Sequence, residues 1–213
     1  MKTAKERRNG IDYSAIRLTD TDIALGKYKE RIGSGIAWEK RGAFQLILLR
    51  RAGLLPHHQL LDYGCGPARG GVHLIKYLDP GHYTGLDINP DYVRAARKVV
   101  EEQNLVNRRP RFVCTSDYHD TQQFDFCLLF SVLNHCTPSE ISAFFRFIKP
   151  RLSPTGSVLI THTQKIALAS YEKDFSRARA FTSSDFDITE FGWTSAANVF
   201  PVIEFRPRES PAV

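Results

Sequence analysis

The chain has 213 residues, enough for one domain, and its 42% hydrophobic and 24% charged residues are typical of a globular protein. This composition excludes a collagen-like or low-complexity chain, and no apolar run approaches the ~20 residues of a membrane helix. The net charge is +6, but the cations are scattered, with the densest clusters at Lys2–Arg8 and Arg108–Arg111. Solubility explains that charge better than nucleic-acid binding does, although an anionic partner stays open.

The N-terminus and the cysteines indicate the cellular compartment. Met1–Arg8 is charged and no apolar stretch follows it, so we expect no secretory signal and a cytoplasmic protein. The four cysteines form no CxxC pair and no spacing with histidine that is typical of zinc sites. We therefore predict free thiols and no bound metal.

The first part of the chain predicts a cap followed by a helix. Residues 11–35 mix apolar and charged positions and end in Gly33-Ser34-Gly35, a candidate hinge. Residues 1–37 are therefore expected to form an N-terminal tail and a cap or lid, and residues 38–213 the main domain. A helical pattern covers 38–54, and its expected apolar positions are Trp38, Phe44, Ile47, Leu48 and Leu55.

From residue 59 the pattern alternates between strands and helices. The strands are expected at 59–63, 82–87, 111–115, 124–130 and 157–161, and the helices at 68–78, 90–104 and 138–152. Asn89 and Pro90 are typical N-cap and first-turn residues for the second of these helices. Such an alternation predicts parallel strands joined by crossover helices that cover both faces, a doubly wound α/β fold.

The last sixty residues have a different pattern. Residues 165–181 are amphipathic and aromatic, and residues 185–191 are compatible with a short helix. Residues 193–197 and 202–206 read as two closing strands with Pro201 between them. Because no helix fits between these strands, they are expected to pair antiparallel.

The strongest chemical signal is the glycine loop Leu61–Gly71, where the first strand meets the first helix. Its small residues let a ligand approach the backbone, and the helix N-terminus offers free N–H groups. Arg69 occupies the third glycine position of a dinucleotide fingerprint. Asp62 would also repel a pyrophosphate, which disfavours a nicotinamide-dependent oxidoreductase and favours a cationic ligand.

Two more acidic residues follow strand ends. Asp87 ends the second strand, where a carboxylate accepts hydrogen bonds from both hydroxyls of a ribose. Asp117 follows the third strand, where it is placed to accept from an adenine amino group, with Tyr118 beside it to cover the ring.

Asp62–Gly70 together with Leu86-Asp87-Ile88 resembles the class I S-adenosylmethionine-dependent methyltransferases, over about residues 38–163. The resemblance implies a mostly parallel seven-stranded sheet with a reversed last strand, a Rossmann-like methyltransferase fold with an N-terminal helical cap. Many members carry glycine where this chain has Ala68. The positions implied to bind the cofactor are Asp62, Tyr63, Gly64, Cys65, Gly66, Gly70, Asp87, Ile88, Asp117, Tyr118, Ser131 and Trp38. For Trp38, the favoured alternative is an ordinary core anchor of its helix.

In that family the segment Phe130–Cys136 runs beside the sulfonium and faces the methyl acceptor. The chain lacks the (Asn/Asp)-Pro-Pro-aromatic motif of members that methylate base amino groups, and it looks more like small-molecule methyltransferases. An oxygen acceptor needs its proton removed, and histidine suits that role. His135 is the first candidate for the base and His162 the second, with a structural role open for both.

The sequence therefore predicts an enzyme that transfers a methyl group from S-adenosylmethionine to a small-molecule acceptor at oxygen or nitrogen, with S-adenosylhomocysteine as product. A protein or RNA methyltransferase, or a non-catalytic binding subunit that kept the pocket, stays an alternative. The oligomeric state is open, and no membrane association is expected.

Overall fold

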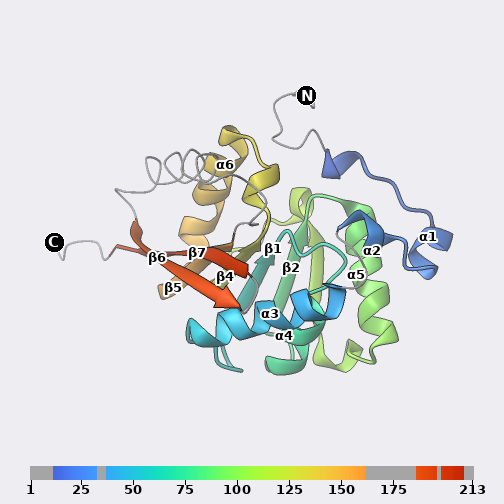
Figure 1. Ribbon diagram of the computed structural model, residues 1–213, viewed down its shortest axis with the longest axis horizontal. Helices are drawn as coiled ribbons and strands as arrows, with labels where there is room; N and C mark the ends of the chain where they lie inside the picture. Colours follow the sequence, from blue (N-terminus) through green and yellow to red (C-terminus); the bar gives the residue numbers. More distant parts are fainter. Residues whose placement is uncertain (1–11, 33–36, 162–185, 196–197, 209–213) are drawn as a thin grey trace. The chain divides into compact units, whose positions relative to one another are not determined.

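The computed structural model describes residues 12–32, 37–161, 186–195 and 198–208 (Figure 1). The chain divides into two compact units. One comprises Tyr13–Asp120, and the other contains the described residues from Thr121 onward.

Seven strands form one sheet in the order β3-β2-β1-β4-β5-β7-β6. β1, β2 and β3 pair in parallel, as do β4 and β5, whereas β7 is antiparallel to both β5 and β6. The predicted fold class is confirmed: a mostly parallel seven-stranded sheet with a reversed last strand, preceded by N-terminal helices, the Rossmann-like methyltransferase arrangement.

The unit Tyr13–Asp120 begins with short helices. Thr19 and Asp22 form a reciprocal capping box that starts α1, which explains how so short a helix is defined. After them comes α3, which packs beside α4 below the strands in Figure 1. In the described part of this region, the helical elements are η2 (Tyr13–Ala15), α1 (Asp20–Ala24), α2 (Tyr28–Arg31) and α3 (Trp38–Arg51).

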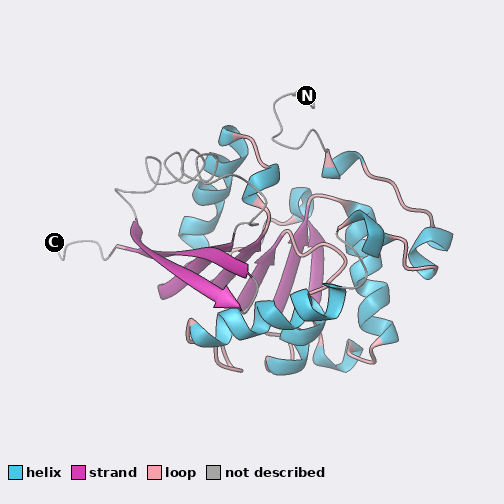
Figure 2. Cartoon of the chain, in the orientation of Figure 1, coloured by secondary structure: helices cyan, strands magenta, loops and turns pink. Residues whose placement is uncertain are grey.

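The rest of this unit is the alternation that the sequence predicted, as Figure 2 shows. Asn89 caps α5 by accepting from the N–H groups of Asp91 and Tyr92, and Pro90 occupies its first turn. β2 is buried along its whole length, as expected for a strand with neighbours on both sides. The elements are β1 (Leu60–Tyr63), α4 (Gly71–Tyr77), β2 (Tyr83–Asp87), α5 (Pro90–Glu102), η4 (Val106–Arg108), β3 (Arg111–Cys114) and η5 (Thr115–Asp117).

The second unit is built on β4 and β5, whose inner residues are fully buried. Thr137 and Glu140 form a capping box at the start of α6. Phe186 packs edge to face with both Phe145 and Phe205, the last two rings are tilted to each other, and the three join α6 to the closing strand pair. The elements are β4 (Phe124–Phe130), η6 (Leu133–His135), α6 (Pro138–Ile148), η7 (Lys149–Arg151), β5 (Leu152–Thr161), β6 (Phe186–Ser195) and β7 (Asn198–Pro207).

Two predictions about the closing strands were wrong. The short helix expected at 185–191 is part of β6: Phe186 is buried while Asp187 and Thr189 are exposed, the two-residue period of a strand. Pro201 lies inside β7 rather than between the strands. Among the described residues, Pro201 pairs with Gly192 of β6. The aromatic segment 165–181 lies outside the described residues.

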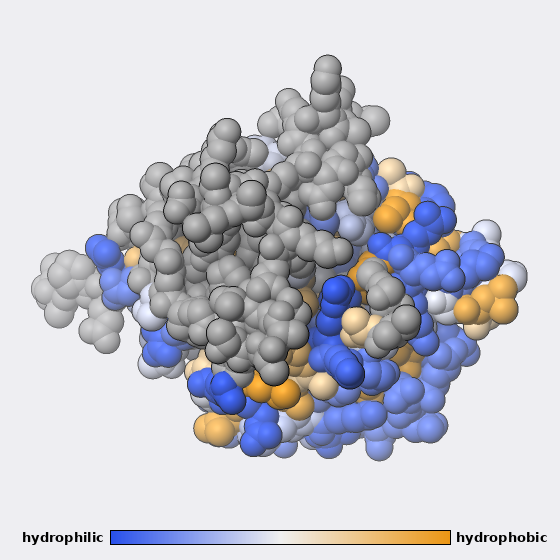
Figure 3. Space-filling model, in the orientation of Figure 1, coloured by the Kyte–Doolittle hydropathy of each residue, from blue (hydrophilic) through white to orange (hydrophobic). Residues whose placement is uncertain are grey.

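The expected apolar face of α3 was partly wrong. Trp38 and Leu48 are buried, but Ile47 and Leu55 are each 47% exposed. Gln45 and Gly42 take part in the buried face instead. On the face shown in Figure 3, apolar patches lie within a largely hydrophilic described surface. Within the described ranges, no helix is long and apolar enough to cross a membrane.

Candidate functional site

The glycine loop after β1 is a tight turn attached to the end of β2. The N–H groups of Gly64 and Cys65 both donate to the carbonyl of Leu86, at 2.7 and 2.9 Å. Gly64 and Gly66 have φ angles of 81° and 54°, a region that favours glycine. Ala68 has a φ angle of 58°, in the same region. The alanine that this chain has in place of glycine therefore strains the backbone at this position.

Asp87 links the glycine loop to the turn between β2 and α5. Its Oδ2 accepts from the Gly66 N–H at 2.8 Å, and its Oδ1 accepts from the Asn89 N–H at 2.9 Å. Burial raises the pKa of Asp87 to about 6, against the lowering effect of these backbone donors. A carboxylate has about four acceptor sites, so capacity remains for two ligand hydroxyls. The next residue, Ile88, is 50% exposed, an apolar surface beside the carboxylate.

Asp62 is a second buried carboxylate in the same unit. Its Oδ2 accepts from the Tyr83 hydroxyl at 2.8 Å. Burial raises the pKa of Asp62 to about 7; the Tyr83 hydrogen bond and Arg69 oppose the rise, and Asp87 adds to it. Two acidic groups with raised pKa values make a position where a cation is favoured and a pyrophosphate is not.

Helix α3 packs closely against the loop. A Cβ atom at Gly70 would lie 2.0 Å from Oε1 of the buried Gln45, and one at Gly42 would lie 2.4 Å from the carbonyl oxygen of Arg69. Both glycines therefore allow the close approach of α3 to the loop. For Gly70, which the sequence placed among cofactor-binding residues, the structure shows this packing role.

Replacing Gly42 tests that close approach. Alanine is favoured over glycine inside a helix by about 0.5–1 kcal/mol, yet we expect Gly42→Ala to destabilise the protein by about 1–3 kcal/mol, because its Cβ would displace the Arg69 carbonyl. Urea unfolding measures the change. Ala43→Gly, one residue along α3, isolates the helix propensity. A Gly42→Ala protein that is more stable than wild type would contradict this packing.

The end of β3 carries the residues expected at an adenine ring. Asp117 is exposed and accepts from the Ser116 hydroxyl at 2.9 Å. Tyr118 is only 4% exposed, and the Arg111 guanidinium lies over its ring, 5.1 Å from the centroid. The Tyr118 ring is therefore packed against protein, whereas Asp117 is open to a ligand.

The N-terminal helices lie against this loop. Trp38 is buried, with the Tyr28 ring 5.8 Å away and the Arg69 guanidinium above it, which makes Trp38 a packing anchor. Arg69 donates to the Ile32 carbonyl at 3.0 Å, and Cδ1 of Ile32 lies 3.7 Å from where a Gly66 Cβ would be. The candidate hinge Gly33-Ser34-Gly35 lies outside the described residues.

The second unit holds the remaining candidates. Ser131 follows β4 with a φ of 60°, and its N–H donates to Oγ1 of Thr161 at 3.1 Å and to the Thr161 carbonyl. A non-glycine residue in this conformation is typical of functional turns. His135 ends η6 and is half-buried. His162 lies outside the described residues.

Sequence reasoning did not assign a site role to Tyr83 or Asn89, the side-chain partner of Asp62 and the backbone partner of Asp87. The parallel pairing of β1 and β2 offered a signal that Tyr83 could reach Asp62. Leu60 pairs with Tyr83, and Asp62 lies two residues farther along β1, on the same face of the strand as Leu60. All four cysteines are free thiols, as predicted. The described part of the chain contains no cluster of three His, Cys, Asp or Glu residues able to hold a metal.

Residues 61–158 match the family described as Methyltransferase domain. Magnesium protoporphyrin IX methyltransferase from Synechocystis, solved with S-adenosylhomocysteine, is similar in structure, with a TM-score of 0.63 and 17% identity over 88% of this chain and 97% of that one. A TehB-like SAM-dependent methyltransferase from Corynebacterium glutamicum has a TM-score of 0.58, with 17% identity over 89% of this chain and 97% of that one.

A third similar structure is a DhpI complex with S-adenosylhomocysteine, with a TM-score of 0.60 and 15% identity over 88% of this chain and 96% of that one. At these identities the structures show the fold, and the family match covers the glycine loop, Asp87 and Asp117. Sheet order, loop and family match agree with the resemblance found in the sequence. In its glycine loop, its sheet order and the family that residues 61–158 match, the chain is similar to the class I S-adenosylmethionine-dependent methyltransferases.

Proposed function

We propose that the protein binds S-adenosylmethionine at the glycine loop and transfers its methyl group to a small-molecule acceptor at oxygen or nitrogen. The observation that carries this proposal is the hydrogen bond from Gly66 to Asp87, which fixes the loop beside a buried carboxylate with remaining acceptor capacity. The similar structures named as a magnesium protoporphyrin IX methyltransferase and as complexes with S-adenosylhomocysteine support it.

The residues present fit this cofactor. Asp62 and Asp87 are buried acids whose raised pKa values a cationic ligand would lower. Asp87 would accept from the ribose hydroxyls, Ile88 would cover one face of the adenine, and Asp117 would accept from its amino group. Gly64 and Gly66, with Tyr63 and Cys65 beside them, would line the methionine half.

The cofactor supplies an activated methyl group for in-line displacement when bound. The chain's part is to hold the donor, exclude water and orient the acceptor. An oxygen acceptor also has to lose a proton, and we assign His135 as the general base that takes it. Ser131 lies in the strained turn that precedes His135. A nitrogen acceptor that arrives unprotonated has no such requirement.

Calorimetric titration with S-adenosylhomocysteine, with NADH in parallel, tests the cofactor class. We expect micromolar binding of the first and none of the second. Binding of NADH alone would refute the proposal, and failure to bind either ligand would favour a non-catalytic role. Small-molecule acceptors are then screened only if S-adenosylhomocysteine binds and NADH does not.

A substitution at His135 separates chemistry from cofactor binding. On an oxygen acceptor we expect His135→Asn to lower kcat by about 10²-fold or more, because the general base is lost, while the Kd for S-adenosylhomocysteine stays within twofold. The control is Ser139→Ala, at a neighbouring exposed position. An unchanged kcat would remove His135 from the mechanism.

A further inference from the structure

We propose that Asn89 is a positioning residue that holds the N-terminal cap segment, Tyr13–Ala24, onto α5 and so couples docking of the cap to occupancy of the cofactor site. The docking of the cap segment is inferred from hydrogen bonds within the unit Tyr13–Asp120 alone. The coupling of that docking to the cofactor rests on the proposed function, because the cofactor site is the one built on Asp87.

Asn89 is fully buried and every part of it has a partner. Its N–H donates to Oδ1 of Asp87, and its side-chain oxygen caps α5. Its Nδ2 group donates to two carbonyls of the cap segment, Tyr13 at 2.6 Å and Ile16 at 3.0 Å. One residue therefore joins the candidate ribose-binding carboxylate, the start of α5 and a segment 76 residues earlier in the chain.

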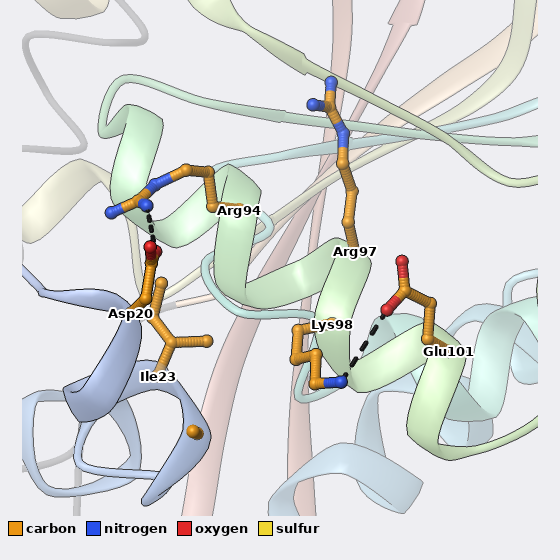
Figure 4. A pocket seen from close by; sticks show the side chains of 7 residues that line it. Asp20, Ile23, Arg94, Arg97, Lys98 and Glu101 are labelled. Carbon is orange, nitrogen blue, oxygen red and sulfur yellow. Dashed lines mark hydrogen bonds and ion pairs between the residues drawn. The ribbon is translucent and has the colours of Figure 1, made fainter.

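Two neighbours on α5 extend this attachment. Oδ2 of Asp91 accepts from the Leu18 N–H at 2.9 Å, and Arg94 donates to the Leu18 carbonyl at 2.7 Å. Arg94 also forms an ion pair with Asp20, at the start of α1. In Figure 4, Arg94 reaches across to Asp20, whereas Lys98 pairs with Glu101 on its own helix.

Apolar packing of Leu18 and Ile23, which are both buried, contributes to this docking, whereas Leu25, just beyond the cap segment, is 67% exposed. An open pocket of about 340 Å³ lies between α1 and α5, lined by Asp20, Ile23, Ala24, Arg94, Arg97, Lys98 and Glu101 (Figure 4). A short segment with two buried apolar side chains opens at a lower free-energy cost than the core, and the hydrogen bonds from Asn89, Asp91 and Arg94 add to what keeps it docked.

The link to the cofactor follows from the shared carboxylate. The N–H of Asn89 holds one oxygen of Asp87, and the docked cap segment holds the Asn89 side chain. A ligand held by Asp87 therefore favours the docked cap, and by reciprocity the docked cap strengthens ligand binding. Losing the attachment should speed release of the ligand.

The test is Asn89→Asp in the full chain. Aspartate keeps the helix cap and nearly the same volume, but it loses both donors to the cap segment and puts an anion against the Tyr13 and Ile16 carbonyls. Without ligand, we expect amide hydrogen exchange at Leu18 and Ile23 to be faster by about tenfold or more, with amides inside α5 unchanged. S-adenosylhomocysteine should dissociate faster by a similar factor.

Asn107→Asp, the same change at an exposed position, is the charge control. Arg94→Gln, on the surface of α5, removes the second attachment and should loosen the same amides if Asn89→Asp does not fold. Unchanged exchange at Leu18, or equal loosening throughout α5, would overturn the role of Asn89. Exchange is measured without ligand, so failure of wild type to bind S-adenosylhomocysteine would refute the proposed function and leave this result standing.

Discussion

At pH 8 the Asp62→Asn protein should be more stable than wild type, by on the order of 3 kcal/mol, and near pH 4 the difference should vanish. Burial raises the pKa of Asp62 to about 7 in the folded protein, above the ordinary value of an aspartate. A group with a raised folded pKa binds its proton more tightly in the folded state. Its contribution to stability is complete below the unfolded pKa and is lost as the pH rises through about 7.

Urea unfolding of the ligand-free proteins at several pH values between 4 and 8 measures this difference. The asparagine oxygen can still accept from Tyr83, so the hydrogen bond is kept while the charge is removed. Asp79→Asn, at an exposed carboxylate, is the matched control for the loss of a negative charge. Parallel stability profiles for Asp62→Asn and wild type would show that Asp62 titrates normally.

Asp87→Asn should weaken binding of S-adenosylhomocysteine by about 1–3 kcal/mol, or roughly 5- to 150-fold. Asparagine keeps one accepting oxygen, but its amide group would face a backbone donor, either Gly66 or Asn89, and it loses the charge that strengthens bonds to ribose hydroxyls. The variant should still fold at pH 8, because the substitution removes a second buried carboxylate whose pKa is raised. Calorimetric titration gives the affinity.

The readout separates binding from folding. Circular dichroism and urea unfolding are measured on the same Asp87→Asn sample, and Asp79→Asn again controls for the loss of an exposed charge. Cofactor affinity equal to that of wild type would remove Asp87 from the site. Lost affinity with lost structure would place Asp87 among residues that shape the loop rather than among those that hold the ligand.

Together these two carboxylates explain why the ligand-free site is costly. Each is buried, and each is less stable ionised than it would be in water. Under the proposed function, a cationic ligand would offset that cost, and the site would gain affinity in the complex at the expense of stability in the free protein. The same argument explains why a pyrophosphate ligand does not suit this loop.

The local pattern of the sequence was sufficient for most of the fold. Strand and helix positions from β1 to β5 follow from hydrophobic period and from caps such as Asn89-Pro90, which act over a few residues. The glycine loop and Asp87 could be located for the same reason, because each is recognised from a short run of consecutive residues at the end of a strand. The error at 185–191 arose where pairing with β7 outweighed a weak local preference.

What the sequence by itself determined is therefore the order of elements, the loop and the acidic residues that follow the strands. Tertiary structure alone decided that Gly42 and Gly70 serve packing, that Ile47 faces solvent, that Tyr83 holds Asp62 and that Asn89 holds the cap segment. These contacts join residues far apart in the chain. Their geometry depends on how whole helices and strands pack, which no local periodicity encodes.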